Sequence, residues 1–308
     1  MKTGHASMTE TAFDGASAEP GKIRRSIAAL LTCHNRRELT LRCLESLRAA
    51  TEPIASSIHV HVFLVDDGCT DGTSEAVAER FPDVTIVPGT GSLYWCGGMR
   101  TAWQAAAREG GYDAYLWLND DVQLHAGFLA SLLDTQTVIR RVTGRSGIVV
   151  GATADEAGGG TSYGEMGPEG IRPAGESARP IESFNGNIVL VPDDVYREVG
   201  GFSRVYTHGF GDIDYACRAR RRGVPIWLAP GHLGSCTMDK VSRWERPDVP
   251  LWRRLAALHR PTGCPPWELA FLTIRHGGWW FPYTVARLYW RALFPRAERK
   301  PAPRKVNA

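Results

Sequence analysis

Three pairs of adjacent aspartates stand at points of the chain where carboxylates could do chemistry. Asp66-Asp67 and Asp120-Asp121 each follow a short apolar run, whereas Asp193-Asp194 follows Pro192 and precedes a third apolar run. Acids at the start of a helix accept hydrogen bonds from free backbone N–H groups and favour the helix dipole. We assign Asp193-Asp194 to that structural role, which leaves two pairs for chemistry.

The pair Asp120-Asp121 carries the stronger signal, because it follows the apolar run 115–118, which is typical of a buried strand. Two carboxylates at the end of such a strand repel each other unless solvent or a cation neutralises them. A hard divalent ion such as Mg²⁺ or Mn²⁺ is commonly bound by one or two carboxylates together with substrate phosphates. The pattern indicates a metal and a diphosphate ligand, and an exposed turn is the simpler alternative.

The pair Asp66-Asp67 ends an apolar strand and enters a loop in which Asp71 and Thr73 are candidate helix caps. A carboxylate at that strand end could instead accept hydrogen bonds from a base N–H or a ribose hydroxyl. In the glycine-rich segment 89–100 that follows, N–H groups at the start of a helix, with Gly98 and Arg100, would suit phosphate oxygens. The segment is neither the dinucleotide fingerprint nor a Walker P-loop.

A further acidic segment, His208-Gly-Phe-Gly211-Asp212-Ile-Asp214, precedes a run of arginines. On a helix that begins at Asp212 the acids would lie in the first turn and the arginines later, as helix electrostatics favours without any chemistry. The Gly-Phe-Gly approach would also present Asp212 at an edge, where its carboxylate could take a proton from a hydroxyl.

The elements that must position these residues alternate along the first half of the chain. Short apolar strands are separated by amphipathic helices, which predicts a mostly parallel sheet covered by helices on both faces. The expected strands are 27–32, 59–65, 84–87 and 114–118, and the expected helices are 38–50, 72–80 and 98–109. Ligands of such sheets bind at the carboxyl ends of the strands, where both chemical aspartate pairs fall. The glycine-rich stretch 152–180 predicts an irregular insertion, followed by a compact segment over 181–236.

Composition sets the class of protein. The chain has 308 residues with 43% hydrophobic and 22% charged side chains, a mixture typical of soluble globular proteins. Residues 1–25 lack periodicity and are expected to form a disordered leader, not a secretory signal. Seven cysteines without a C-x-x-C pair favour reduced thiols in the cytoplasm. No apolar stretch is long enough to predict a membrane span.

Four motifs taken together resemble the family 2 inverting glycosyltransferases of the GT-A fold. They are Leu31-Thr-Cys-His-Asn35-Arg36, Val65-Asp-Asp-Gly-Cys-Thr-Asp71-Gly-Thr73, Leu118-Asn-Asp-Asp121 and Asp212-Ile-Asp214-Tyr-Ala-Cys-Arg218. The likeness extends over about residues 26–236 and is greatest to bacterial rhamnosyl- and galactofuranosyltransferases that extend surface polysaccharides. It implies a catalytic domain over 26–238, with a nucleotide-binding half (26–150) and an acceptor half (151–238), and a C-terminal helical extension over 239–308.

The resemblance also implies roles for individual residues. Thr32 and Asn35 would lie beside the nucleoside, Asp66 or Asp67 would contact base or ribose, Asp120 would bind ribose or metal, and Asp121 would bind the divalent Mg²⁺ or Mn²⁺. Asp212 matches the second acid of the family's Glu-Asp pair, the general base, while Gly211 replaces the first. The family's late metal-binding His falls on Cys236, so that residue or His232 would substitute, or the ligand is missing. We assign Asn185, Asn187, Trp95 and Asp214 to the acceptor side, with a helix-start role as the alternative for Asp214.

The last segment is basic and rich in aromatic residues. From Lys240 onward it has 14 basic and 4 acidic residues, against 22 and 29 before that point. Nine aromatic residues from Trp267 to Phe294 are interleaved with arginines, which suits a segment that lies on an anionic membrane and meets a lipid-linked glycan. The alternative is packing on the catalytic domain or on a second copy of the chain. The segment contains no recognised nucleic-acid-binding module.

The expected activity is transfer of a sugar, with inversion, from a nucleoside-diphosphate sugar to a glycan or lipid-linked glycan. dTDP-rhamnose and UDP-hexoses are equally defensible donors, and the site of action would be the cytoplasm or the inner face of the plasma membrane. One alternative is a sugar-nucleotide nucleotidyltransferase, which would need a glycine-rich loop after the first strand, but residues 32–37 contain no glycine. The other is a non-catalytic binding scaffold, which would most plausibly lack an acid at position 121 or 212.

Overall fold

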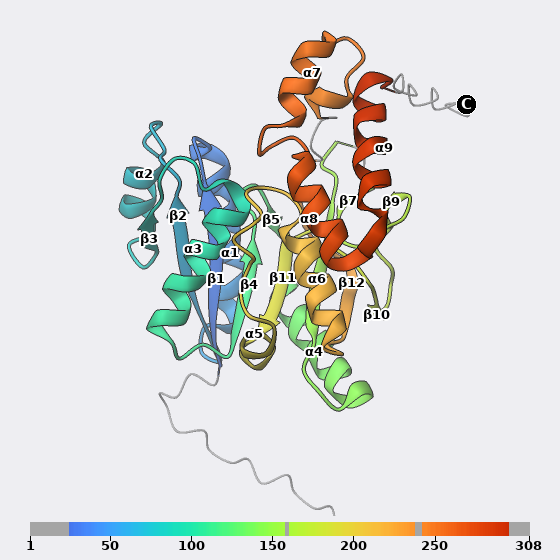
Figure 1. Ribbon diagram of the computed structural model, residues 1–308. Coiled ribbons are helices and arrows are strands. Elements are labelled where there is room, and N and C mark those ends of the chain that lie inside the picture. The colour runs from blue at the N-terminus through green and yellow to red at the C-terminus, as the bar shows by residue number, and fades with distance from the viewer. Residues whose placement is uncertain (1–24, 158–159, 238–241, 296–308) are drawn as a thin grey trace, which may run out of the picture.

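The computed structural model describes residues 25–157, 160–237 and 242–295, and one mixed β-sheet forms its centre (Figure 1). The main strands are β1 (Arg25–Cys33), β2 (Ile58–Asp66), β3 (Thr85–Pro88), β4 (Ala114–Leu118), β6 (Ile148–Ala154), β10 (Arg179–Pro180), β11 (Ile188–Pro192) and β12 (Ile226–Ser235). Their order is β10-β12-β6-β11-β4-β1-β2-β3, with β5 (Gln123–Leu124) and β7 (Thr161–Tyr163) paired to β12 and β6. The expected leader lies outside the described residues except for Arg25, which begins β1.

The sheet reverses its direction of growth beside β1. The chain proceeds outward from β1 through β2 to β3, all parallel, and then returns to place β4 parallel to β1 on its other side. The strand β11 runs antiparallel to both of its neighbours, and β12 is parallel to β6. Because a crevice forms at the carboxyl ends of strands where the order reverses, the ends of β1 and β4 are the expected ligand site.

Alternation of side chains along the strands gives each face of the sheet its own core. Ile27, Ala29 and Leu31 of β1 pack with α1 (Arg37–Thr51), α2 (Thr73–Arg80) and α4 (Phe128–Thr143). Ala28 and Leu30 face the other way, toward α3 (Tyr94–Glu109), α5 (Asp193–Val199) and α6 (Gly211–Arg221). The predicted α/β architecture, with a mostly parallel sheet between helices, is confirmed.

Local differences from the expected elements concern their ends and the insertion. The helix predicted from Gly98 begins at Tyr94, so half of the glycine-rich segment is helical. Asp193 starts α5 as predicted. The stretch 152–180 is irregular as expected, and it contains β7 and the short hairpin of β8 (Met166–Gly167) and β9 (Gly170–Ile171).

The C-terminal part forms a helical layer above the sheet, drawn in orange and red in Figure 1. It contains α7 (Leu251–Leu258), α8 (Pro266–Gly277) and α9 (Phe281–Leu293). A small core of Trp244, Leu258, Leu288 and Ala292 holds it together, and α8 contacts α6 of the body. None of the helices in the described segments has both the length and the apolar character needed to cross a bilayer. The charged end from 296 onward lies outside the described residues.

Candidate active site

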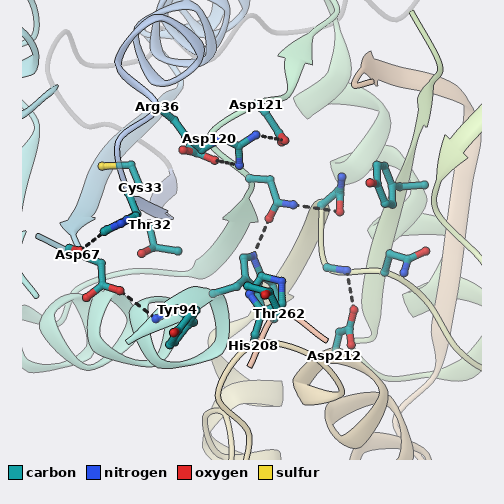
Figure 2. A pocket seen from close by; sticks show the side chains of 18 of the residues that line it. Thr32, Cys33, Arg36, Asp67, Tyr94, Asp120, Asp121, His208, Asp212 and Thr262 are labelled. Carbon is teal, nitrogen blue, oxygen red and sulfur yellow. Dashed lines mark hydrogen bonds and ion pairs between the residues drawn. The ribbon is translucent and has the colours of Figure 1, made fainter. Parts of the chain in front are cut away.

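A cavity of about 460 Å³ opens at the carboxyl ends of β1 and β4 (Figure 2). The sheet, the start of α3, the start of α6 and the C-terminal helical layer all contribute to its wall. Its lining residues are Thr32, Cys33, His34, Arg36, Asp67, Gly91, Tyr94, Trp95, Asn119, Asp120, Asp121, Tyr163, Asn185, Gly186, Asn187, His208, Gly209, Asp212 and Thr262. Eight of the residues predicted for the site therefore line one cavity, namely Thr32, Asp67, Trp95, Asp120, Asp121, Asn185, Asn187 and Asp212.

The carboxylates at the end of β2 bind backbone. Asp67 is buried and accepts hydrogen bonds from the N–H groups of Gly91, Leu93 and Tyr94 at 2.8, 3.1 and 2.9 Å, so it fastens the start of α3 to the sheet. Asp66 does not line the cavity; it accepts the Cys69 N–H at 2.7 Å and the Ser74 hydroxyl. These hydrogen bonds lower the pKa of Asp66, although burial opposes them. Asp67 shapes the cavity from below, while Asp66 holds the next loop.

Three further residues predicted to bind the nucleotide, besides Asp66, are not among the lining residues of the cavity. A Cβ at Gly98 would come within 2.1 Å of Thr32 Oγ1, so glycine there lets α3 approach β1 and supports Thr32 from behind. Asn35 accepts the Thr70 N–H at 2.7 Å and thereby joins two loops. Arg100 donates to the Ser203 carbonyl at 3.2 Å. Each of these residues shapes the walls without facing the cavity.

Arg36 bridges the two carboxylates at the end of β4. Its Nη1 lies 3.0 Å from Asp120 Oδ1 and its Nη2 lies 2.5 Å from Asp121 Oδ2 (Figure 2). Burial raises the pKa of Asp120 to about 7, and repulsion from Asp121 adds to this effect while the Arg36 guanidinium opposes it. Asp120 therefore depends on a neighbouring cation to stay ionised. The sequence signal for Arg36 is its place directly after Asn35 in the first motif.

The acid pair offers carboxylate oxygens, which are suitable ligands for a hard divalent ion. Asp121 Oδ1 is buried and has no hydrogen-bond partner. An oxygen of this kind is the ligand that Mg²⁺ and Mn²⁺ prefer. Asp120 and Asp121 would hold the ion, and the remaining positions would be left to substrate phosphates and water.

Neither of the two candidates for a third ligand, His232 and Cys236, is found in a ligand cluster with this pair among the described residues. His232 lies on β12, where its Nε2 is 2.9 Å from Thr161 Oγ1. Cys236 is buried, with its Sγ 3.9 Å from Asn187 Nδ2. Within the described segments, one group of three potential ligands lies within mutual reach, and it consists of Cys33, Asp66 and Cys69. That group offers two thiols and a carboxylate already occupied by Cys69 and Ser74, which suits a hard ion less well than the acid pair.

Asp212 lies apart from the acid pair, at the start of α6 (Figure 2). Its Oδ2 accepts the Gly186 N–H at 3.1 Å and its Oδ1 accepts the Ile213 N–H at 2.8 Å. Burial raises the pKa of this carboxyl, and the backbone hydrogen bonds only partly offset that effect. A carboxylate in this setting has a raised affinity for a proton, which is the property that a general base requires.

Close packing explains why the residue before Asp212 on α6 is a glycine, Gly211. A Cβ at this position would lie 2.4 Å from the Sγ of Cys96 on α3. The two helices therefore pack too closely for an acid here, at the place where the resemblance puts the family's first acid.

Polar side chains cross the floor of the cavity between the acid pair and Asp212. Trp95 Nε1 donates to Asn119 Oδ1 at 2.7 Å, and Asn119 Nδ2 donates to Asn187 Oδ1 at 3.1 Å. Asn185 Oδ1 is buried without a partner. The chain fixes the indole and the two amides, and Asn185 offers an unused acceptor for a hydroxyl.

Asp214, one of the residues assigned to the acceptor side, is fully buried and does not line the cavity. Its Oδ2 lies 2.8 Å from Arg218 Nε, and its Oδ1 lies 3.2 Å from Arg275 Nη1 and 2.8 Å from His276 Nε2. It lies in the first turn of α6 and joins this helix to α8.

The C-terminal layer reaches the cavity, which the sequence did not indicate. Thr262, between α7 and α8, lines the wall. Glu268 of α8 is buried and accepts the Thr207 hydroxyl at 2.8 Å. The Thr207 carbonyl in turn accepts the Cys96 and Gly97 N–H groups at the start of α3. The layer is thus built into the site through the 203–210 loop.

Comparisons of sequence show that the chain is similar to sugar-transferring proteins. The model of the family "Glycosyl transferase family 2" matches residues 29–155. The chain is 29% identical over 277 residues to N-acetylglucosaminyl-diphospho-decaprenol L-rhamnosyltransferase of Mycobacterium tuberculosis, covering 78% of this chain and 81% of the relative. It is also 30% identical over 147 residues to an uncharacterized protein of Mycobacterium bovis, covering 44% of this chain and 51% of that protein.

A comparison of structures agrees in fold. A mannosyltransferase from Pyrobaculum calidifontis in complex with GDP-Man and Mn²⁺ matches with a TM-score of 0.51 over 88% of this chain and 81% of its own. Its sequence identity is 17%, so the likeness concerns the arrangement of sheet and helices.

Proposed function

The chain is a family 2 glycosyltransferase with the GT-A fold, and from that premise we propose that it transfers L-rhamnose from dTDP-rhamnose to a hydroxyl of a lipid-linked glycan. The M. tuberculosis relative is named for rhamnosyl transfer to N-acetylglucosaminyl-diphospho-decaprenol, which favours rhamnose over a UDP-hexose and a lipid-linked acceptor over a free glycan.

The observation that carries the proposal is the presence, in one cavity, of an acid pair on one side and a lone carboxylate of raised pKa on the other. The nucleoside diphosphate lies against Asp120 and Asp121, with Thr32 beside the nucleoside. The acceptor lies between Trp95, Asn185 and Asp212. A displacement at the anomeric carbon needs this separation, because the acceptor attacks from the face opposite the leaving group and inverts the configuration.

The chain's own residues perform the proton transfer and the positioning. Asp212 takes the proton of the acceptor hydroxyl as that oxygen attacks. Asn185 Oδ1 orients a sugar hydroxyl, and the Trp95 ring, fixed through Asn119, gives the sugar a flat wall. A divalent ion bound to Asp120 and Asp121 would stabilise the negative charge that develops on the departing diphosphate.

Donor class and metal dependence can be tested by thermal shift with dTDP, UDP and GDP, each with and without Mn²⁺. A ligand at 100 times its dissociation constant stabilises the folded state by about 2.7 kcal/mol. We expect a Mn²⁺-dependent shift with dTDP that disappears in Asp121→Ala. Transfer from dTDP-rhamnose to a polyprenyl-diphosphate-linked GlcNAc, with inverted product configuration by NMR, would complete the test. Formation of a sugar nucleotide from a nucleoside triphosphate and a sugar phosphate would overturn the proposal.

The acceptor's lipid would be met by the C-terminal layer. Trp279 is 93% exposed and Trp280 is 70% exposed, and α9 adds exposed Trp290. Arg287 and Arg291 of the same helix supply positive charge. Exposed tryptophans interleaved with arginines suit the interface of an anionic bilayer, so we propose that this layer rests on the membrane and receives the acceptor there.

Sedimentation with vesicles tests the membrane contact. We expect binding to vesicles that contain phosphatidylglycerol, weaker binding to pure phosphatidylcholine, and a clear loss in the double variant Trp279→Ser/Trp280→Ser. Val142→Ser is the matched control, because Val142 is 66% exposed on α4 of the body. Equal sedimentation of both variants would argue against this surface.

A further inference from the structure

Arg36 is the one arginine or lysine among the residues that line the cavity in the described segments. Its guanidinium spans both carboxylates of the acid pair, at 3.0 Å from Asp120 and 2.5 Å from Asp121. Arg36 therefore binds the same two carboxylates that would bind a divalent ion. A cation with two positive charges and a guanidinium with one compete for those oxygens.

The position of Arg36 allows it to leave that pair. The residue precedes α1, and 40% of its side chain is exposed. By contrast, Asp120 is buried and fixed by the Thr40 hydroxyl at 3.3 Å as well as by Arg36. If Arg36 left, the buried Asp120 and the half-buried Asp121 would lose their positive partner. Only another cation could then neutralise these two carboxylates. Movement of Arg36 and arrival of a metal are therefore coupled.

The diphosphate gives a released Arg36 a second partner. Arg100, the basic residue expected near the phosphates, donates to the Ser203 carbonyl and does not line the cavity. Among the described residues that line the cavity, Arg36 is thus the one permanently positive side chain that a nucleoside diphosphate bound beside the acid pair would meet. A guanidinium suits phosphate oxygens because it can donate two parallel hydrogen bonds.

We propose that Arg36 is an exchangeable counter-ion: it neutralises Asp120 and Asp121 while no metal is bound, and it transfers to the donor diphosphate when a divalent ion takes its place. This inference rests on the proposed function. Under this proposal the metal displaces Arg36 from the acid pair. The displaced Arg36 then binds the diphosphate, so that bound metal raises the affinity for the donor. Arg36 is a positioning residue for the leaving group.

The test is a pair of affinities that change in opposite directions. Mn²⁺ binding without nucleotide is followed by electron paramagnetic resonance, and dTDP binding at saturating Mn²⁺ by calorimetry. In Arg36→Met we expect Mn²⁺ alone to bind about threefold to tenfold more tightly, because its competitor is gone. We expect dTDP to bind about tenfold more weakly, because a charged donor to the diphosphate is lost.

Two further variants make the result specific. Arg37→Met removes an exposed neighbouring arginine that does not line the cavity, and it should change neither affinity. Arg36→Lys keeps the charge but loses the double donor, so it should leave Mn²⁺ affinity near that of the wild type and weaken dTDP. If Arg36→Met does not fold, Arg36→Gln, which also lacks the positive charge, replaces it in both affinity measurements.

Several outcomes would overturn the inference. Equal Mn²⁺ affinity in wild type and Arg36→Met, or weakening of both ligands together, would show that Arg36 does not compete with the metal. Unchanged dTDP affinity would remove its second role. The proposed function fails separately, when the wild type transfers no sugar from any nucleoside-diphosphate donor.

Discussion

Asp212 and Asp214 lie on the same helix, two residues apart, in opposite environments. Asp212 faces the cavity and accepts hydrogen bonds only from backbone N–H groups among its described contacts. Asp214 is fully buried in the interface between α6 and α8, against Arg218, Arg275 and His276. Two residues on a helix differ by about 200° in direction, so both acids cannot face the same side.

The comparison separates a reactive acid from a structural one by their partners. Three basic side chains, Arg218, Arg275 and His276, contact the Asp214 carboxylate and hold it in the interface between α6 and α8, away from the cavity. No basic side chain has a hydrogen bond or ion pair with Asp212 among the described residues, and burial raises the pKa of Asp212. A carboxylate without a cationic partner at the edge of a cavity is the better candidate for chemistry, even when a second acid is close by in sequence.

The strongest way to break this comparison is to neutralise Asp212. Asp212→Asn keeps the size of the side chain but removes its basicity, and general-base assistance is worth about 10²–10⁴-fold in rate. We expect turnover with dTDP-rhamnose to fall by that factor, while dTDP affinity and melting temperature stay near wild type. Transfer at a rate close to that of the wild type would show that another group accepts the proton.

Neutralising Asp214 should give the opposite pattern. Asp214→Asn leaves the buried Arg218 without its carboxylate, and breaking a buried pair costs about 3–5 kcal/mol of stability. We expect a large fall in the free energy of unfolding in urea, with activity lost only as the protein unfolds. Arg197→Gln is the control, because it breaks an exposed ion pair with Asp193, worth less than about 1 kcal/mol. A stable but inactive Asp214→Asn protein would reverse the two roles.

The smallest effect concerns pH, and it sharpens the assignment of the base. Asp212 must be deprotonated to accept a proton, so the rate should fall as pH decreases through its pKa. Because burial raises that pKa, the fall should begin at a higher pH than for an exposed aspartate. The measurement is the pH profile of turnover at saturating donor and Mn²⁺. The residual activity of Asp212→Asn should lack this acidic limb; its persistence would assign the limb to Asp120.

The site residues that were predicted best from the sequence are those that directly follow the end of a strand. The apolar run 115–118 and the acids after it had to fall at the carboxyl edge of the sheet, and the structure places Asp120 and Asp121 there beside Thr32. The sequence predicted less well which loop side chains face inward. Asn35 and Arg100 bind neighbouring loops, and Gly98 packs behind Thr32. The conformation of the loops determines which side chains face the cavity, and the spacing of residues in the sequence does not predict that conformation.

Contacts between distant segments were beyond prediction. Arg36 and Asp120 are 84 residues apart, and Thr207 and Glu268 are 61 apart. Such pairs follow from the path of the whole chain, since no periodicity links their positions. Thr262 shows the same limit: composition marked its segment as a basic aromatic extension, and only the folded chain brings it to the cavity wall.

The contact between Gly211 and Cys96 constrains how this sequence can change over time. A Cβ at 211 would lie 2.4 Å from the Cys96 sulfur but 3.5 Å from the Cys96 Cβ, which is an ordinary contact distance. A side chain at 211 therefore requires the Cys96 sulfur to move or to be removed, as in Cys96→Ala. An acid beside Asp212 thus depends on the residue at position 96 of α3, so the packing of two helices couples the changes that these two positions can accept.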